Sequence, residues 1–149
     1  MKKKKIWIMN HYATGMFFNK GGRHYWFAEN LFKHGYEPTI FCANTRHNSP
    51  DIIETGGGKY TVKNANGVPF VFVKTSPYSG NGFDRIRNMF TFSKNLFSTS
   101  KTYAKLNGNP DVILASSPHS LTQVAALIIA KRFGIPCICE VRDLWPESF

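Results

Sequence analysis

The chain has few acidic residues, few cysteines and no long hydrophobic segment. Its 149 residues contain 9 Asp and Glu against 19 Lys and Arg, which gives a net charge of +10 at pH 7. Such an imbalance favours anionic partners: nucleic acid, an anionic membrane surface or phosphorylated ligands. No apolar run approaches the ~20 residues of a transmembrane helix. The apolar segment after residues 2–5 is too short for a signal peptide, so we expect a cytoplasmic protein with at most peripheral membrane contact.

The cysteines form neither a disulfide pattern nor a metal-binding pattern. Cys42, Cys137 and Cys139 all lie in apolar runs, and no further Cys or His recurs at ligand spacing. We therefore predict three reduced core residues and no metal.

The common nucleotide-binding motifs are also absent. Gly-x-Gly-x-x-Gly does not follow the first predicted strand, and the second ends at Asn44 without an acidic residue. A nicotinamide-dependent dehydrogenase is therefore disfavoured. The chain has no P-loop either.

The sequence does contain alternating strand and helix patterns in a single predicted domain, residues 1–149. This order predicts an α/β fold: a Rossmann-like, mostly parallel sheet with helices on both faces. Ser117 is the predicted N-cap of the third helix, with Pro118 at its first position. Residues 11–20 and 44–59 are predicted loops. The predicted strands cover residues 4–10, 37–43, 111–115 and 136–141, with a hairpin over 60–73, and the helices cover 22–34, 83–106 and 117–134.

Polar residues follow three of the predicted parallel strands. Ligands of open α/β sheets bind beyond the carboxyl ends of the strands, so we expect these residues to meet at one edge. The first strand leads to a glycine pair at a helix start, where backbone N–H groups and the helix dipole favour an anion. The residues concerned are Asn10, His11, Gly21, Gly22, Arg23, Ser116, His119, Arg142 and Asp143.

Each of these features also has a purely structural interpretation. A glycine pair before a helix is more often ordinary turn chemistry. His119 is either a neutral imidazole that faces a ligand or an ordinary first-turn residue. Asp143 either pairs with Arg142 or caps a helix, or it orients a substrate hydroxyl and accepts its proton.

The long helix predicted over residues 83–106 carries a basic stripe beside an aromatic one. Basic and aromatic side chains arranged in this way suit an interface with anionic lipid. The alternative is a helix that packs on the sheet and exposes its basic side chains to solvent. The basic residues are Arg87, Lys94, Lys101 and Lys105, and the aromatic ones are Phe83, Phe90 and Phe97.

Several short stretches together resemble the N-terminal domain of bacterial glycosyltransferases of family 4, of the type that makes O-antigen (lipopolysaccharide) and capsular polysaccharide. The resemblance implies one half of a GT-B fold. Such enzymes transfer a sugar from a nucleotide-sugar to an acceptor, usually with retention and without a metal. The stretches are Asn10-His-Tyr12, Gly21-Gly-Arg23, Gly35-Tyr36, Ala115-Ser-Ser-Pro-His-Ser-Leu-Thr122 and Glu140-Val-Arg-Asp-Leu-Trp-Pro-Glu147.

The resemblance also implies roles for individual residues. Gly21, Gly22 and Arg23 would approach the donor diphosphate. Arg142 and Asp143 would lie at the sugar-transfer point, although many relatives have His where this chain has Arg142. The acceptor side, often occupied by a lipid-linked sugar, would be lined by Asn10, His11, Ser116 and His119.

The same resemblance implies partners that the 149 residues do not include. A C-terminal nucleotide-sugar-binding domain would complete the enzyme, so we expect the chain alone to be inactive. The other expected partners are a nucleotide-sugar, a lipid-linked saccharide and the anionic inner-membrane surface, with no cofactor and no nucleic acid. Alternative interpretations are a basic nucleic-acid-binding module, which lacks a recognised motif, half of a GT-B sugar-nucleotide epimerase, or a scaffold domain.

Overall fold

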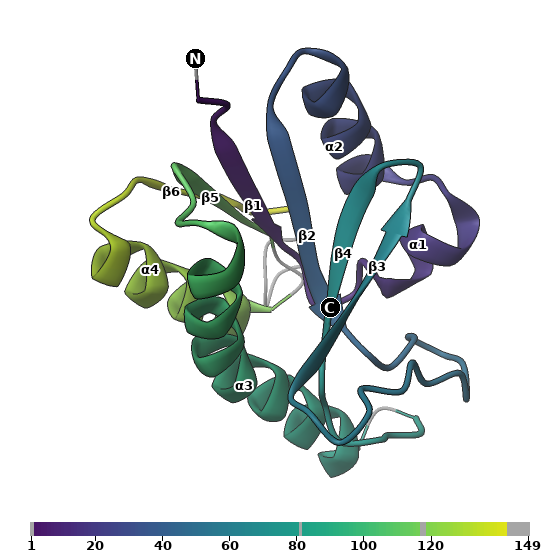
Figure 1. Ribbon diagram of the computed structural model, residues 1–149. Helices are drawn as coiled ribbons and strands as arrows, with labels where there is room; N and C mark the ends of the chain where they lie inside the picture. Colours follow the sequence, from purple (N-terminus) through teal and green to yellow (C-terminus); the bar gives the residue numbers. More distant parts are fainter. Residues whose placement is uncertain (1, 81, 117–118, 143–149) are drawn as a thin grey trace.

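The computed structural model describes residues 2–80, 82–116 and 119–142. These residues form one six-stranded sheet in the order β3-β4-β2-β1-β5-β6, with helices on both faces (Figure 1). All neighbouring strands are parallel except β3 and β4. The elements are β1 (Lys5–Met9), α1 (Thr14–Asn19), α2 (Arg23–Lys33), β2 (Glu37–Ala43), β3 (Tyr60–Ala65), β4 (Val68–Val73), α3 (Phe83–Asn107), β5 (Val112–Ser116), α4 (Ser120–Phe133) and β6 (Cys137–Glu140).

The central strands β1, β2 and β4 are largely buried on both faces, which explains why they are almost continuously apolar. In β1, Trp7 and Met9 pack in a core with residues of α3 and α4, whereas Ile8 packs in a second core with residues of α2. Figure 1 shows α3 and α4 on one side of the sheet and α1 and α2 on the other. The predicted α/β class with a mostly parallel sheet is therefore confirmed.

The hairpin of β3 and β4 is closed by a two-residue turn at Asn66 and Gly67. Both residues have positive φ, 49° and 87°, which is the conformation that a type I′ turn requires. The turn places Ala65 opposite Val68 and fixes the register of the only antiparallel pair among the described strands.

Two local predictions were wrong. The segment 11–20, predicted as a loop, contains helix α1, because Met16 and Phe17 pack against the core on the α2 side despite the helix-breaking tendency of Gly15. The helix after β5 begins at Ser120 and not near Ser117. Its N-cap is His119, whose side chain is held by a distant residue and whose backbone stays extended. Ser117 and Pro118 lie outside the described residues.

The prediction that all cysteines belong to the core was also wrong. Cys42 is buried, but Cys137 is only partly buried and Cys139 is exposed. The reason is topological, since β6 is an edge strand among the described residues and pairs only with β5 there. All three thiols are free.

One part of the sheet is less well covered than the rest. On the α2 side, an apolar groove of about 410 Å³ lies between that helix and strands β1 and β5. Ile6, Ile8 and Leu114 line it from the sheet, and Phe27 and Leu31 line it from α2.

Candidate functional site

The carboxyl ends of β1, β5 and β6 lie side by side, because β1 pairs with β5 and β5 pairs with β6. This arrangement brings together Asn10 and His11 after β1, Ser116 at the end of β5 and Glu140 at the end of β6. The polar side chains form two hydrogen-bonded clusters, one around Glu140 and one around His11. Together we call them the rim.

The carboxylate of Glu140 is the centre of the first cluster, the Glu140 cluster. Arg23 donates two hydrogen bonds to Oε2, from Nε at 3.0 Å and from a terminal nitrogen at 2.7 Å. Oε1 accepts from the hydroxyl of Ser116 at 2.8 Å and contacts His24 Nε2 at 2.9 Å. Gln123 donates to the backbone carbonyl of Glu140 at 2.9 Å. One acidic residue thus joins the start of α2, the end of β5, α4 and β6.

The hydrogen bonds of Asn10 fix the tautomer of His24. The backbone N–H of Tyr12 donates to Asn10 Oδ1 at 3.1 Å, so the other amide atom of Asn10 is the NH₂ donor. That group donates to His24 Nδ1 at 2.9 Å. The proton of a neutral His24 therefore lies on Nε2 and is donated to Glu140.

Protonation in this cluster reflects two opposing effects. Burial, the largest effect, raises the pKa of Glu140, but the hydrogen bonds from Arg23, Ser116 and His24 outweigh it and lower the pKa to about 2. Burial lowers the pKa of His24 below 6.5 more than Glu140 raises it. At pH 7 the cluster therefore pairs a carboxylate and a guanidinium with a neutral imidazole.

The second cluster, the His11 cluster, consists of neutral groups that are buried or, in the case of His119, partly buried. His11 Nε2 lies 2.7 Å from Asn88 Oδ1 of α3, and His11 Nδ1 lies 2.9 Å from His119 Nε2. Burial, followed by the neighbouring His119, lowers the pKa of His11 to about 3. Burial, followed by the charge of Arg85, lowers the pKa of His119 to about 4.

Tyr12 and its neighbours cover the outer side of the His11 cluster. The Tyr12 ring stacks on His11, with 4.6 Å between ring centroids, and its hydroxyl accepts a hydrogen bond from Arg85 Nε at 3.0 Å. The ring of His47 lies 4.6 Å from that of Tyr12, and His47 bonds to the Tyr78 hydroxyl. Aromatic faces and a guanidinium therefore border the two buried imidazoles.

The glycine pair lies at the start of α2, where it was expected. Gly22 is the N-cap, with φ of 115°, and a Cβ there would lie 2.8 Å from Met16 Cγ. Both observations explain why glycine is needed at position 22 without reference to a ligand. Arg23 follows it, and its side chain is 52% exposed although it is paired with Glu140.

The other predicted residues fall into three groups. Asn10, His11 and Ser116 are buried and form hydrogen bonds to other residues of the rim. They therefore position its side chains and do not themselves face solvent. Arg142 lies on the same edge as Arg23, with its Nε 3.9 Å from Glu140 Oε1. Asp143, predicted with Arg142 at the transfer point, lies outside the described residues.

Sequence reasoning missed Glu140, His24 and Asn88 as members of the site. Glu140 was visible as the acidic end of an apolar strand, and His24 as the neighbour of Arg23. Asn88 gave no signal, because one amide in a 25-residue helix is unremarkable until its partner, 77 residues away, is known.

The basic and aromatic stripes of α3 face solvent. Phe83 is 91% exposed and Phe90 is 58% exposed, whereas Phe97 packs partly against the core beneath the Arg132 guanidinium. Among the described residues, no helix is long and apolar enough to cross a membrane. The four basic residues of the stripe, Arg87, Lys94, Lys101 and Lys105, are all exposed.

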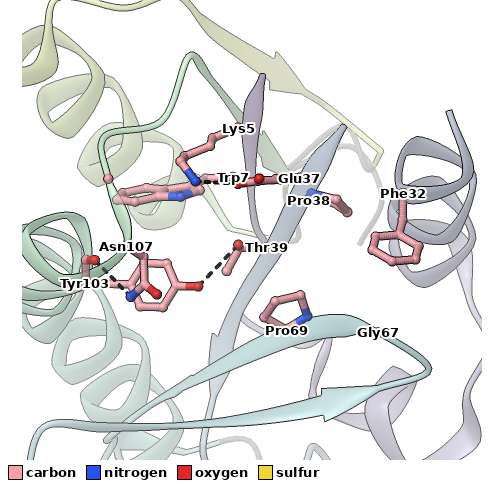
Figure 2. Close-up of a pocket in the computed structure, with 11 residues that line it drawn as sticks. Lys5, Trp7, Phe32, Glu37, Pro38, Thr39, Gly67, Pro69, Tyr103 and Asn107 are labelled. Atoms are coloured by element: carbon pink, nitrogen blue, oxygen red, sulfur yellow. Dashed lines mark hydrogen bonds and ion pairs between the residues drawn. The ribbon is translucent and has the colours of Figure 1, made fainter. Parts of the chain in front are cut away.

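A separate pocket of about 220 Å³ lies at the opposite, amino edge of the sheet. Figure 2 shows Trp7 and Tyr103 on one side of it and Phe32 on the other, with Thr39 between them. Its polar groups bond to one another: Lys5 pairs with Glu37, and the hydroxyls of Thr39 and Tyr103 lie 3.5 Å apart. The pocket is smaller than typical small-molecule sites, and it is remote from the rim.

No protein-family model and no curated protein matches this chain. Among solved structures, the chain is similar to the C-terminal domain of a hydrogenase from Pyrococcus furiosus, with a TM-score of 0.56 and 17% sequence identity. The alignment covers 94% of this chain and 93% of that one. At this identity the likeness shows a shared α/β fold and nothing about chemistry. Within the described residues, no group of three or more His, Cys, Asp or Glu is placed to hold a metal ion.

We predict that Glu140→Gln destabilises the domain by about 2 kcal/mol, because the new NH₂ group faces donors and the charge that balances Arg23 is lost. Urea unfolding at pH 7 measures the change. Glu54→Gln, which removes the same charge at an exposed position, is the control and should change stability by less than about 0.5 kcal/mol. Equal effects of the two substitutions would show that Glu140 does not organise the rim.

The pKa values of His11 and His119 also predict how stability depends on pH. Both are lowered from 6.5, so the unfolded chain binds more protons than the folded one between pH 6.5 and about 4. Their contribution is complete above pH 6.5 and is lost on acidification through that range, by about 2 kcal/mol for each imidazole between pH 7 and 5. Urea unfolding at both pH values measures it. His119→Gln should reduce proton uptake on unfolding by about one, and an unchanged pH dependence would contradict the assignment.

Proposed function

We propose that this chain is the acceptor-side domain of a glycosyltransferase that moves a sugar from a nucleotide-sugar to a lipid-linked or saccharide acceptor in surface polysaccharide synthesis. The observation that carries the proposal is the rim, where a cationic cluster and a neutral imidazole cluster lie next to each other at the carboxyl edge of the sheet. A sugar diphosphate needs both kinds of group, because its phosphates are anionic and its hydroxyls are neutral.

The Glu140 cluster suits the anionic part of such a ligand, which we take to be the diphosphate of a lipid-linked acceptor, whereas the family resemblance assigned Arg23 to the donor diphosphate. Arg23 and Arg142 both lie against the carboxylate of Glu140, so these three side chains of the described residues together carry a net positive charge. The half-exposed guanidinium of Arg23 stands at the N-terminus of α2, where the helix dipole also favours negative charge. The carboxylate holds the guanidinium in place, and a fixed guanidinium binds phosphate with less loss of entropy than a free one.

The His11 cluster suits the neutral part. His119 lies partly exposed at the N-terminus of α4, beside the Tyr12 ring, with 6.2 Å between ring centroids. Aromatic faces and neutral hydrogen-bonding groups are what a sugar ring contacts in proteins. In this proposal a second domain binds the nucleotide, and transfer takes place where that domain meets the rim. The nucleotide-sugar is a substrate, and the proposal requires no cofactor or metal.

The exposed face of α3 supports contact with a membrane, where lipid-linked acceptors are found. Phe83, Phe90 and the basic stripe lie on that face. Asn88 and Phe92 of the same helix contact His11. A membrane bound to α3 would therefore lie next to the rim. We propose peripheral binding to the anionic inner membrane of the cell through this helix.

The function is tested with a soluble acceptor analogue, a short polyprenyl chain joined through diphosphate to one sugar. We expect it to bind to the 149 residues and to shift the NMR signals of Arg23 and His119. Arg23→Gln should weaken binding about tenfold, since it removes a charge-assisted bond of about 1.4 kcal/mol. Lys33→Gln, which removes the same charge at the other end of α2, is the matched control.

The same titration separates the proposal from its main alternative. Absence of binding by the analogue, together with salt-sensitive binding of random-sequence RNA, would replace the glycosyltransferase assignment with that of a nucleic-acid-binding module.

Membrane contact is tested by co-sedimentation with vesicles of phosphatidylglycerol and phosphatidylcholine. Replacing Lys94, Lys101 and Lys105 with Glu should weaken binding at least a hundredfold, because each lysine near an anionic surface contributes about 1 kcal/mol. The control replaces Lys33, Lys59 and Lys63, which are exposed and lie outside α3. Equal losses in the two triple variants would show a general charge effect and no role for α3.

A further inference from the structure

The pocket at the amino edge of the sheet contains a hydrogen-bond donor that has no acceptor among the described residues. Trp7 of β1 is 1% exposed and lines this pocket. Its ring packs against Phe41 and Phe133, with 4.7 and 5.6 Å between ring centroids, and neither neighbour offers an acceptor atom. The indole Nε1–H can only donate, and a buried indole N–H usually has a partner. The indole of Trp7 therefore needs an acceptor from outside the described residues.

The nitrogen of Trp7 is open to the pocket and is not enclosed by the core. The described side-chain atoms that are both closed off from water and unpaired include His119 Nδ1 but not Trp7 Nε1. Figure 2 shows the nitrogen of the Trp7 ring on the side toward Lys5 and Glu37, which line the same pocket. A molecule in the pocket can therefore reach the N–H.

Two prolines explain why the sheet leaves a pocket at this place. Strands β2 and β4 pair with each other only from Ile40 and Phe70 onward. Pro38 and Pro69 precede these residues and line the pocket. Proline has no backbone N–H and cannot donate to a strand ladder. The pocket thus lies where the ladder between β2 and β4 has not yet begun.

The remaining polar groups of the pocket favour a neutral ligand that can donate as well as accept. Lys5 and Glu37 neutralise each other, so a charged ligand would lose its hydration without gaining a free counter-charge. The hydroxyls of Thr39 and Tyr103 lie 3.5 Å apart, whereas hydroxyl hydrogen bonds normally span about 2.5–3.0 Å. Both hydroxyls therefore retain the capacity to bond to a closer partner.

We propose that this pocket binds a small, neutral, ring-shaped amide whose carbonyl oxygen accepts from Trp7 Nε1 and whose N–H donates to the Tyr103 hydroxyl. A cyclic amide carries these two groups on adjacent atoms. Its apolar ring would contact Phe32, Pro38 and Pro69. The volume of about 220 Å³ equals roughly seven water molecules at about 30 Å³ each, which limits the ligand to one ring. This site lies at the edge opposite the rim and is independent of the proposed glycosyl transfer.

The first test is an NMR titration of the wild-type chain with 2-pyrrolidone, a cyclic amide. We expect the indole proton of Trp7 to move downfield in a saturable way, because it gains an acceptor. The indole proton of Trp26, which is 56% exposed on α2, should not move. The charged, ring-opened form of the same molecule, 4-aminobutyrate, should leave both signals unchanged. A Trp7 signal that ignores 2-pyrrolidone, or that responds equally to 4-aminobutyrate, overturns the proposal.

The second test assigns the two hydrogen bonds separately, with cyclopentanone as a probe that has the carbonyl group but no N–H. Tyr103→Phe should weaken binding of 2-pyrrolidone about threefold to tenfold and leave cyclopentanone binding unchanged. Trp7→Phe should weaken binding of both probes about tenfold, and Trp26→Phe is the matched control. Equal weakening of the two probes by Tyr103→Phe, or unchanged binding to Trp7→Phe, overturns the proposal. If Trp7→Phe does not fold, the wild-type titration and Tyr103→Phe decide without it.

Discussion

The carboxylate of Glu140 is the group on which the organisation of the rim depends. Parallel strands bring their ends to one edge, but they do not by themselves fix loops that belong to different βα units. Glu140 does so, because Arg23 and His24 at the start of α2 and Ser116 at the end of β5 all donate to its two oxygens. Its position at the end of an edge strand leaves it partly solvated, with 16% of the side chain exposed. The carboxylate thus avoids the full cost of burying a charge.

Two consecutive residues of the first loop, Asn10 and His11, serve the two clusters separately. Asn10 orients His24 toward the charged cluster, and His11 joins the neutral chain that runs from Asn88 to His119. For His24, an amide with one unambiguous backbone partner determines the tautomer of the imidazole. The rim therefore combines a charged region and a neutral region, and the two are joined through the adjacent residues Asn10 and His11. The protonation state of each region is set by burial and by a few directional bonds.

The sequence predicted the fold well and the site only in part, and the difference is physical. Strands, long helices and the Asn66-Gly67 turn follow from local periodicity and backbone preference, which act over a few residues. The rim depends on contacts between residues as far as 77 and 117 positions apart, such as His11 with Asn88 and Arg23 with Glu140. Helix α4 shows the difference: local signals favoured a start at Ser117, but the helix begins at Ser120, and its N-cap His119 bonds to His11, 108 residues away. Likewise, edge position and not hydrophobic pattern decides that Cys139 is exposed.

The central position of β1 has a consequence for synthesis of the chain. This strand is made first, yet it pairs with β5, and His24 reaches its carboxylate partner only 116 residues later. At 5–20 residues per second, translation of that interval takes roughly 6 to 23 s. During this time an imidazole that ends fully buried remains in water. Pairings over such sequence separations also slow folding, because the chain loses the entropy of loop closure before the stabilising contacts form. The Glu140 cluster therefore cannot form before β6 has been synthesised.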